Sequence, residues 1–223
     1  MANRTVITLG CIMVAALVAD AKLVGAAPSF APEITVLVYN RVHVATVDVQ
    51  KAERLAGEIF ADTGIRVRWE EGSLADEAAR SLDFSSGANS SGGCETVRAV
   101  RVLRVQLEQG PPHGLPNALG FALPCAKYVS HANIFVDRCQ TVVKDIQTLS
   151  FSNVMGHAIA HEIGHVLLGP TEHSAAGLMR GRWRRADWQL AAQSFIRFDG
   201  RQALDMRENI AASGPGFAEP GSR

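Results

Sequence analysis

The sequence lacks an excess of either charge, because its 22 lysines and arginines are balanced by 22 aspartates and glutamates. A nucleic-acid-binding protein needs a basic excess to neutralise phosphates, so we expect no nucleic-acid partner. After the N-terminus the chain also lacks an apolar run long enough to cross a bilayer, so we expect no stable membrane insertion of the mature chain. Hydrophobic residues make up 47% of the 223 residues, which indicates one domain with a substantial core.

The first 27 residues have the pattern of a secretory signal peptide. Residues 5–19 follow Arg4 and carry no charge, and small residues at positions 25–27 offer a cleavage site before Pro28. The run is short for a membrane span, although an uncleaved anchor or a buried N-terminal helix is the alternative. We therefore expect a secreted or periplasmic protein with a signal peptide at 1–27, and the sequence leaves open whether it is cleaved.

Cysteine is scarce, with four residues in the chain. Cys94, Cys125 and Cys139 would remain after cleavage, so one pair could bridge in an oxidising compartment and leave an odd thiol. We favour a bridge between Cys125 and Cys139, which flank one short segment, but the sequence does not determine the pairing.

Hydrophobic periodicity predicts alternating strands and helices. The first strand, first helix and second strand suggest a β-α-β unit with a right-handed crossover, in which Asp48 caps the helix and Gly64 ends it. Residues 212–223 are rich in glycine and proline and are predicted to form a flexible tail, which leaves one domain at 28–211. Strands are expected at 33–44, 65–69, 97–107, 118–124 and 131–137, and helices at 47–63, from 150 or 152 onward, and at 187–197.

The strongest chemical signal is an H-E-x-x-H pattern at residues 161–165, inside the long helix. His161 and His165 are four residues apart, so both imidazoles lie on one side of the helix and can bind a single metal ion. Glu162 lies one step round the helix, where its carboxylate can take a proton from a metal-activated water.

The residues after this pattern strengthen the metal-site interpretation. Gly169 and Pro170 end the helix directly after the histidine pair, and His173 follows the turn as a third nitrogen ligand. Residues 174–179 form a tight stretch of small residues that ends in Met179.

With these residues the segment 161–179 resembles the metzincin clan of zinc endopeptidases, and most closely its matrixin branch. The resemblance covers roughly residues 33–200, strongly in the metal segment and weakly elsewhere. It implies an α+β catalytic domain with a twisted, mostly parallel five-stranded sheet, an antiparallel edge strand, an active-site helix, a Met-turn and a C-terminal helix. It also implies that Met179 packs beneath the metal, and that the edge strand binds an extended peptide through Gly120, Phe121 and Ala122.

The chain departs from the clan in the spacing to the third histidine. The usual positions of the glycine and the third ligand are occupied by Leu168 and Thr171, so His173 comes two residues later than in the clan. Glu172 and, in a two-His-one-Glu site, Glu208 are alternative oxygen donors. The remaining cleft candidates are interpreted as follows: His157 lies beside the site without ligating, and Trp183 and Trp188 anchor the core.

The sequence thus predicts a secreted zinc endopeptidase that acts on a peptide or protein substrate. Its Zn²⁺ would be held by His161, His165 and His173, with Glu162 as the general base. Two alternatives remain, a secreted zinc-binding protein without catalytic activity and a two-His-one-Glu metallopeptidase. The oligomeric state is not predicted.

Overall fold

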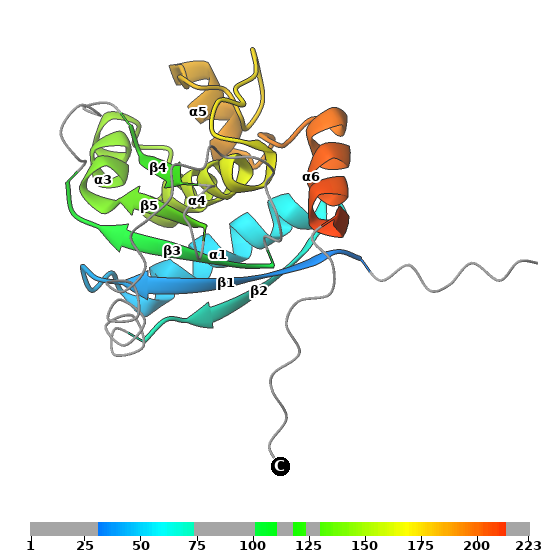
Figure 1. Ribbon diagram of the computed structural model, residues 1–223. Coiled ribbons are helices and arrows are strands. Elements are labelled where there is room, and N and C mark those ends of the chain that lie inside the picture. The colour runs from blue at the N-terminus through cyan, green and yellow to red at the C-terminus, as the bar shows by residue number, and fades with distance from the viewer. Residues whose placement is uncertain (1–30, 74–100, 111–117, 124–129, 213–223) are drawn as a thin grey trace, which may run out of the picture. The chain divides into compact units, whose positions relative to one another are not determined.

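The computed structural model describes residues 31–73, 101–110, 118–123 and 130–212. Within this part of the chain the strands form one five-stranded sheet, in which the edge strand that ends the sheet is antiparallel and the other pairs are parallel (Figure 1). The α+β class and the mostly parallel sheet with an antiparallel edge strand are therefore confirmed. In spatial order the strands are β2 (Arg66–Glu71), β1 (Glu33–Asn40), β3 (Val102–Glu108), β5 (His131–Phe135) and β4 (Gly120–Leu123).

The predicted β-α-β unit is formed by β1, α1 (Thr46–Ala61) and β2, with β1 and β2 parallel. The expected N-cap is wrong, because Ala45 occupies that position. Asp48 lies in the first turn instead, where a carboxylate is favoured by the positive end of the helix dipole. The helix ends before Gly64 as predicted, and the φ of 78° at Gly64 favours glycine.

The chain changes from strand to helix without a turn after β5. That strand ends at Phe135, and α3 (Val136–Asp145) begins at the next residue. The sequence analysis extended the strand to residue 137 and did not predict α3. Cys139 on α3 is a buried free thiol, so the favoured bridge to Cys125 is not formed; Cys125 itself lies outside the described residues.

The long helix α4 (Phe151–Leu168) begins where it was predicted, with the Ser150 side chain accepting a hydrogen bond from the Asn153 amide at 3.1 Å. It packs against α1 and beside β4 and β5 (Figure 1). Met155, Ile159 and Ile163 are fully buried, as their spacing predicts. Burial extends round most of the helix, however, so α4 has a core side and a cleft side and little surface in open solvent.

Two helices follow α4, whereas one was predicted. α5 (Arg185–Ala192) corresponds to the expected helix at 187–197, but α6 (Gly200–Ala212) is the last helix and was missed. Met206 and Ile210 of α6 are buried in the core, and the Asn209 side chain donates to the Leu167 carbonyl of α4 at 2.8 Å.

Several predictions concern residues outside the described part of the chain. They are the signal peptide at 1–27, the start of the third strand at 97–100, Pro124 at the end of the fourth, and the tail beyond Ala212, the last residue of α6. Among the described residues, no helix combines the length and the apolar character that a membrane crossing requires.

Candidate metal centre and cleft

The end of α4 is set by the two residues that the sequence analysis singled out. Gly169 has a φ of 125°, a conformation that favours glycine, and its amide donates to the His165 carbonyl at 2.9 Å. Pro170 follows and cannot continue the helix. The chain therefore turns immediately after the second histidine and returns past the end of the helix.

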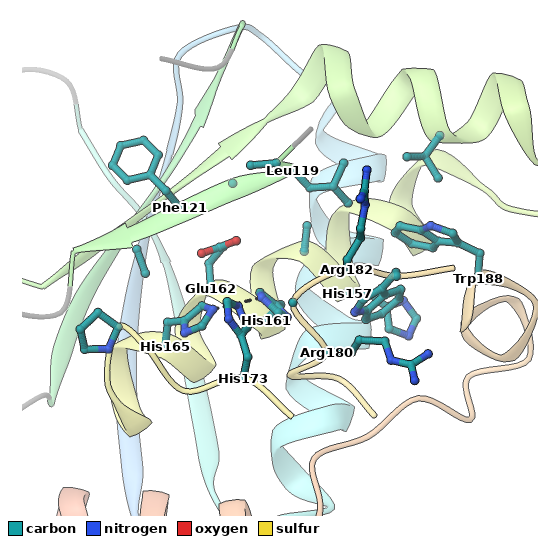
Figure 2. Close-up of a pocket in the computed structure, with 18 residues that line it drawn as sticks. Leu119, Phe121, His157, His161, Glu162, His165, His173, Arg180, Arg182 and Trp188 are labelled. Atoms are coloured by element: carbon teal, nitrogen blue, oxygen red, sulfur yellow. Dashed lines mark hydrogen bonds between the residues drawn. The ribbon is translucent and has the colours of Figure 1, made fainter. Parts of the chain in front are cut away.

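His161 and His165 face each other through their Nε2 atoms, which are 3.1 Å apart (Figure 2). The Nδ1 of His161 donates to the Leu178 carbonyl at 2.7 Å, and the Nδ1 of His165 donates to the Gly169 carbonyl at 3.2 Å. A carbonyl only accepts hydrogen bonds, so each Nδ1 carries the proton and each Nε2 presents a lone pair. Two facing lone pairs repel each other unless a cation lies between them.

His173 reaches the same point despite the longer spacing. Its ring centroid lies 5.8 Å from that of His161 and 4.7 Å from that of His165. A Cβ at Gly181 would lie 3.1 Å from the His173 ring, so the absence of a side chain at Gly181 leaves space for the imidazole.

The three histidines fit a metal ion. Their ligand atoms all lie within 4.8 Å of one another, and no other group of metal-ligating side chains occurs in the described part of the chain. Burial lowers the pKa of His161 to about 4, and burial also lowers the pKa of His165. Both imidazole rings are therefore neutral near pH 7, the form in which a histidine nitrogen can bind a metal ion. Glu172 and Glu208, the alternative oxygen donors, are both exposed and belong to no such group.

Glu162 lies on the cleft side of α4, between the histidines and β4 (Figure 2). Its side chain is buried, and this burial raises the pKa of the carboxyl to about 8. A Cβ at Gly120 would lie 2.8 Å from the Cγ of Glu162, so the edge strand and the carboxyl are in close contact. The structure thus brings Glu162 and the predicted substrate strand together.

Met179 is fully buried beneath α4. A Cβ at Gly164 would lie 2.6 Å from the Met179 Sδ, so the sulfur packs directly against the helix between the two ligand histidines. The Met179 carbonyl accepts a hydrogen bond from the Ser174 amide at 2.9 Å, which closes the loop that carries His173.

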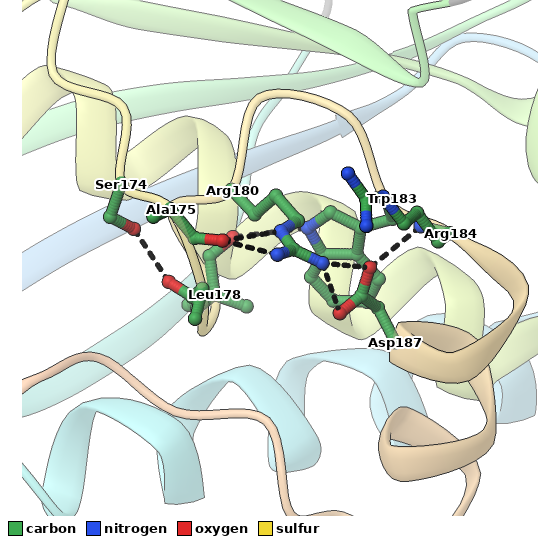
Figure 3. A network of polar contacts seen from close by, with 8 residues as sticks. Ser174, Ala175, Leu178, Arg180, Trp183, Arg184 and Asp187 are labelled. Carbon is green, nitrogen blue, oxygen red and sulfur yellow. Dashed lines mark hydrogen bonds and ion pairs between the residues drawn. The ribbon is translucent and has the colours of Figure 1, made fainter.

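A polar network holds this loop against α5 (Figure 3). The Nη1 of Arg180 donates to both carboxylate oxygens of Asp187, at 2.9 and 2.8 Å. The Nε of Arg180 donates to the Ala175 carbonyl at 2.7 Å. Asp187 also accepts a hydrogen bond from the Arg184 backbone amide at 2.7 Å.

Close by, the Leu178 carbonyl accepts hydrogen bonds from both His161 and the Trp183 indole, the latter at 3.2 Å. The loop therefore orients the His161 ring through its own backbone.

The metal centre opens into a cleft of about 780 Å³ between β4 and α4. Gly120, Phe121 and Ala122 line it, as the resemblance implies for a substrate strand. Within the described sheet β4 is an edge strand that pairs only with β5.

The cleft also contains residues to which the sequence analysis gave other roles. Trp183 and Trp188 both line it, with ring centroids 4.6 Å apart, so they are cleft walls as well as packing residues. His157, interpreted from the sequence as a neighbour of the site that does not ligate, lines the cleft too. The sequence placed the two tryptophans just after the loop that carries His173, and this was the only signal for their role. It was not enough, because the path that the chain takes after this loop depends on the Arg180–Asp187 ion pair.

The chain matches no protein-family model and no curated protein sequence. Among solved structures it is similar to archaemetzincin from Methanopyrus kandleri, with 16% identity and a TM-score of 0.44 over 83% of this chain and 98% of that chain. It is also similar to metalloproteinase-II from Bacteroides fragilis, with 15% identity and a TM-score of 0.45 over 81% of this chain and 54% of that chain. The chain thus spans about half the length of the Bacteroides protein. Both likenesses are distant, so the function is inferred from the site residues themselves.

Proposed function

We propose that this chain is a secreted zinc-dependent endopeptidase, with His161, His165 and His173 as zinc ligands and Glu162 as the general base. The observation that carries the proposal is that three imidazoles converge on one point beside a buried carboxyl in an open cleft. Imidazoles are preferred zinc ligands, and three of them leave a coordination position for water or substrate. The resemblance of residues 161–179 to the metzincin clan favours the same reaction.

The backbone prepares the histidines for this role. The Leu178 and Gly169 carbonyls hold the Nδ1 protons, which leaves both Nε2 atoms free to ligate and makes the rings better donors. Bound zinc would lower the pKa of water to about 7 and polarise the peptide carbonyl. Glu162 would accept a proton from the attacking water and pass it to the leaving amine, a role worth roughly 10²–10⁴-fold in rate.

The pKa of Glu162 is consistent with a general base that becomes ionised when a metal ion binds nearby. Burial alone raises the pKa of this carboxyl to about 8. A cation within a few ångströms favours the carboxylate form and lowers the pKa. Glu162 would therefore be ionised near pH 7 in the loaded protein, where it must accept a proton.

The substrate would be a peptide or protein segment bound in extended form along β4. The position of this strand at the edge of the described sheet supports backbone pairing, while Gly120, Phe121 and Ala122 border the path past Glu162. The predicted signal peptide at 1–27 adds export to the proposal; N-terminal sequencing of the protein from the periplasm or medium would test it.

Zinc content and peptide hydrolysis, measured on the same purified protein, test the proposal. We expect one zinc per chain and cleavage of casein or a mixed peptide library that a chelator stops and zinc restores. Glu162→Gln is expected to keep the zinc and lose at least about a hundredfold in turnover. Glu172→Gln, an exposed glutamate next to His173, is the matched control and should keep full activity.

The two alternatives give different results. A zinc-binding protein without catalysis would hold one zinc and leave every peptide intact. A two-His-one-Glu site would keep stoichiometric zinc and activity in His173→Ala, but neither Glu172 nor Glu208 belongs to the group of ligand atoms that contains His161 and His165.

A further inference from the structure

The cleft continues beyond the metal centre to a second region around His157. This residue lies one helical turn before His161, on the side away from His165, and Trp188 lies on the same side (Figure 2). The His157 side chain is 1% exposed and contacts the Trp183 ring edge-on, with the centroids 5.6 Å apart. A buried histidine thus forms part of the cleft wall without belonging to the metal-ligating group.

The hydrogen bond that His157 makes defines what its other nitrogen can do. Nδ1 lies 2.9 Å from the Asn153 carbonyl of its own helix, so Nδ1 carries the proton. Nε2 is then an acceptor, and within the described residues this buried atom has no hydrogen-bond partner. A buried acceptor without a partner is unfavourable by about 1–3 kcal/mol, which is why such atoms in native proteins nearly always have a role or a partner.

Two donors of the surrounding loop, on Arg180 and Trp183, are already used. The Trp183 indole N–H donates to the Leu178 carbonyl. The guanidinium of Arg180 donates to Asp187 and to Ala175. Neither can satisfy Nε2 without breaking the network that holds the metal loop, so the acceptor is left for a group that enters the cleft.

We propose that this region binds a substrate side chain that is flat, uncharged and tipped by a hydrogen-bond donor, as in tyrosine, next to the bond to be cleaved. The inference rests on the proposed function and names its substrate class. Trp183, Trp188 and Val142 provide apolar and aromatic surface for a ring. His157 Nε2 accepts the donor at the tip.

The region disfavours a cationic side-chain tip, and the His157 acceptor favours a donor over a carboxylate. Arg180 and Arg182 line the same part of the cleft, so a lysine or arginine tip meets like charge. A carboxylate has no proton to give and would present its lone pairs to that of His157. Glu162, the only acidic residue among the described cleft residues, belongs to the metal centre.

The test uses fluorogenic peptides that differ only at the residues flanking the scissile bond. Tyrosine and 4-aminophenylalanine carry a donor at the ring tip, whereas phenylalanine and O-methyltyrosine do not. We expect kcat/KM to be roughly tenfold higher for the tyrosine and 4-aminophenylalanine peptides than for the other two, which corresponds to one net hydrogen bond. Equal rates for all four peptides, or a preference for glutamate, would overturn the proposal.

Two variants assign the preference to His157. His157→Leu should reduce the donor preference to about one, while His157→Gln, which keeps an acceptor oxygen, should retain part of it. His131→Leu, a half-buried histidine outside the cleft, is the matched control and should discriminate like the wild type. A His157→Leu protein that still prefers tyrosine would overturn the assignment. If that variant does not fold, the comparison of tyrosine and O-methyltyrosine peptides on the wild type still tests whether the cleft prefers a donor at the ring tip.

Failure of the proposed function would look different. If no peptide is hydrolysed, the same four peptides are compared by equilibrium binding to the zinc-loaded protein. Tighter binding of the donor pair then supports the His157 site without catalysis, and equal binding rejects it.

Discussion

The sulfur of Met179 and the α-carbon of Gly164 are packed so closely that a methyl group on Gly164 would lie 2.6 Å from the Sδ. Gly164 stands between His161 and His165 of α4, so this contact joins the loop that carries Met179 to the turn of the helix that carries the two histidines. Phe198 closes the same space, at 2.8 Å from the added Cβ.

Gly164→Ala is therefore expected to destabilise the protein although alanine is the better helix former. Overpacking of a filled core costs about 1–3 kcal/mol, against about 1 kcal/mol gained in helix propensity. Urea unfolding measures the difference. Gly200→Ala at the start of α6, where a Cβ meets nothing within 4 Å, is the control and should be neutral or stabilising. An equal effect at both sites would contradict the packing argument.

Gly120→Ala should impair folding as well as catalysis, because the atom closest to the added methyl is the backbone carbonyl oxygen of Asn133. The added methyl would contact the Glu162 side chain at 2.8 Å and would also press on the Asn133 carbonyl of β5. Displacement of a catalytic group by about 1 Å can lower the rate about a hundredfold. We expect kcat to fall about 10- to 100-fold with zinc still bound. Leu123→Ala, at the exposed end of the same strand, should leave kcat unchanged.

His173→Ala should weaken zinc binding by more than the roughly 10- to 100-fold typical of losing an outer partner of a ligand. The measurement is competition for zinc with a chromogenic chelator. Glu172→Ala removes the neighbouring carboxylate and should leave the affinity unchanged. Equal affinities of the two variants would show that His173 does not bind the metal.

Asp187→Ala should loosen the loop that carries His173 and Leu178. Removal of the carboxylate leaves Arg180 without its main partner, and we expect a loss of about 1–3 kcal/mol in the free energy of unfolding. Because the loop orients His161 through Leu178, zinc affinity should also fall, by about 10- to 100-fold. Asp205→Ala, which breaks the exposed pair with Arg201, is the control and should change stability by less than about 0.5 kcal/mol.

The metal-free protein should lose stability on acidification partly through His157. Burial, and to a lesser extent the charge of Arg197, lower the pKa of His157 to about 4 from an ordinary value of 6.5, despite its bond to Asn153. The unfolded chain takes up this proton below pH 6.5 and the folded chain only below about 4, so the free energy of unfolding falls across that window. Between pH 7 and 4.5 we expect His157→Gln to lose roughly 2 kcal/mol less than the wild type, measured by urea unfolding in chelator. Parallel losses would contradict the assignment.

The sheet and the metal segment could be predicted because their signals are local. Periodicity is enough to find β1, α1 and α4, and the 161–179 pattern contains every residue of the candidate metal centre. α3 was missed because no breaking residue separates it from β5, so one apolar run continues from strand into helix.

α6 was missed although its signal was present. Asp199 and Gln202 exchange hydrogen bonds at the start of the helix. The backbone amide of Gln202 donates to the Asp199 side chain at 2.8 Å, and the backbone amide of Asp199 donates to the Gln202 side chain at 3.0 Å. This is the spacing of a capping box. The cleft walls are a different case, since the entry of Trp183 and His157 into the cleft depends on how α4, the metal loop and α5 pack together. No local pattern contains that information.

The parallel order of the sheet has a consequence for how this protein folds. Thr35 of β1 pairs with Val102 of β3, so the centre of the sheet forms only after a long stretch of chain has closed on itself, which is slow. The three histidines of the candidate metal centre, in contrast, all lie within residues 161–173. The slow step of folding is therefore expected to be the closure of β1 onto β3, whereas the histidine segment and the β4–β5 pair involve only residues close in sequence.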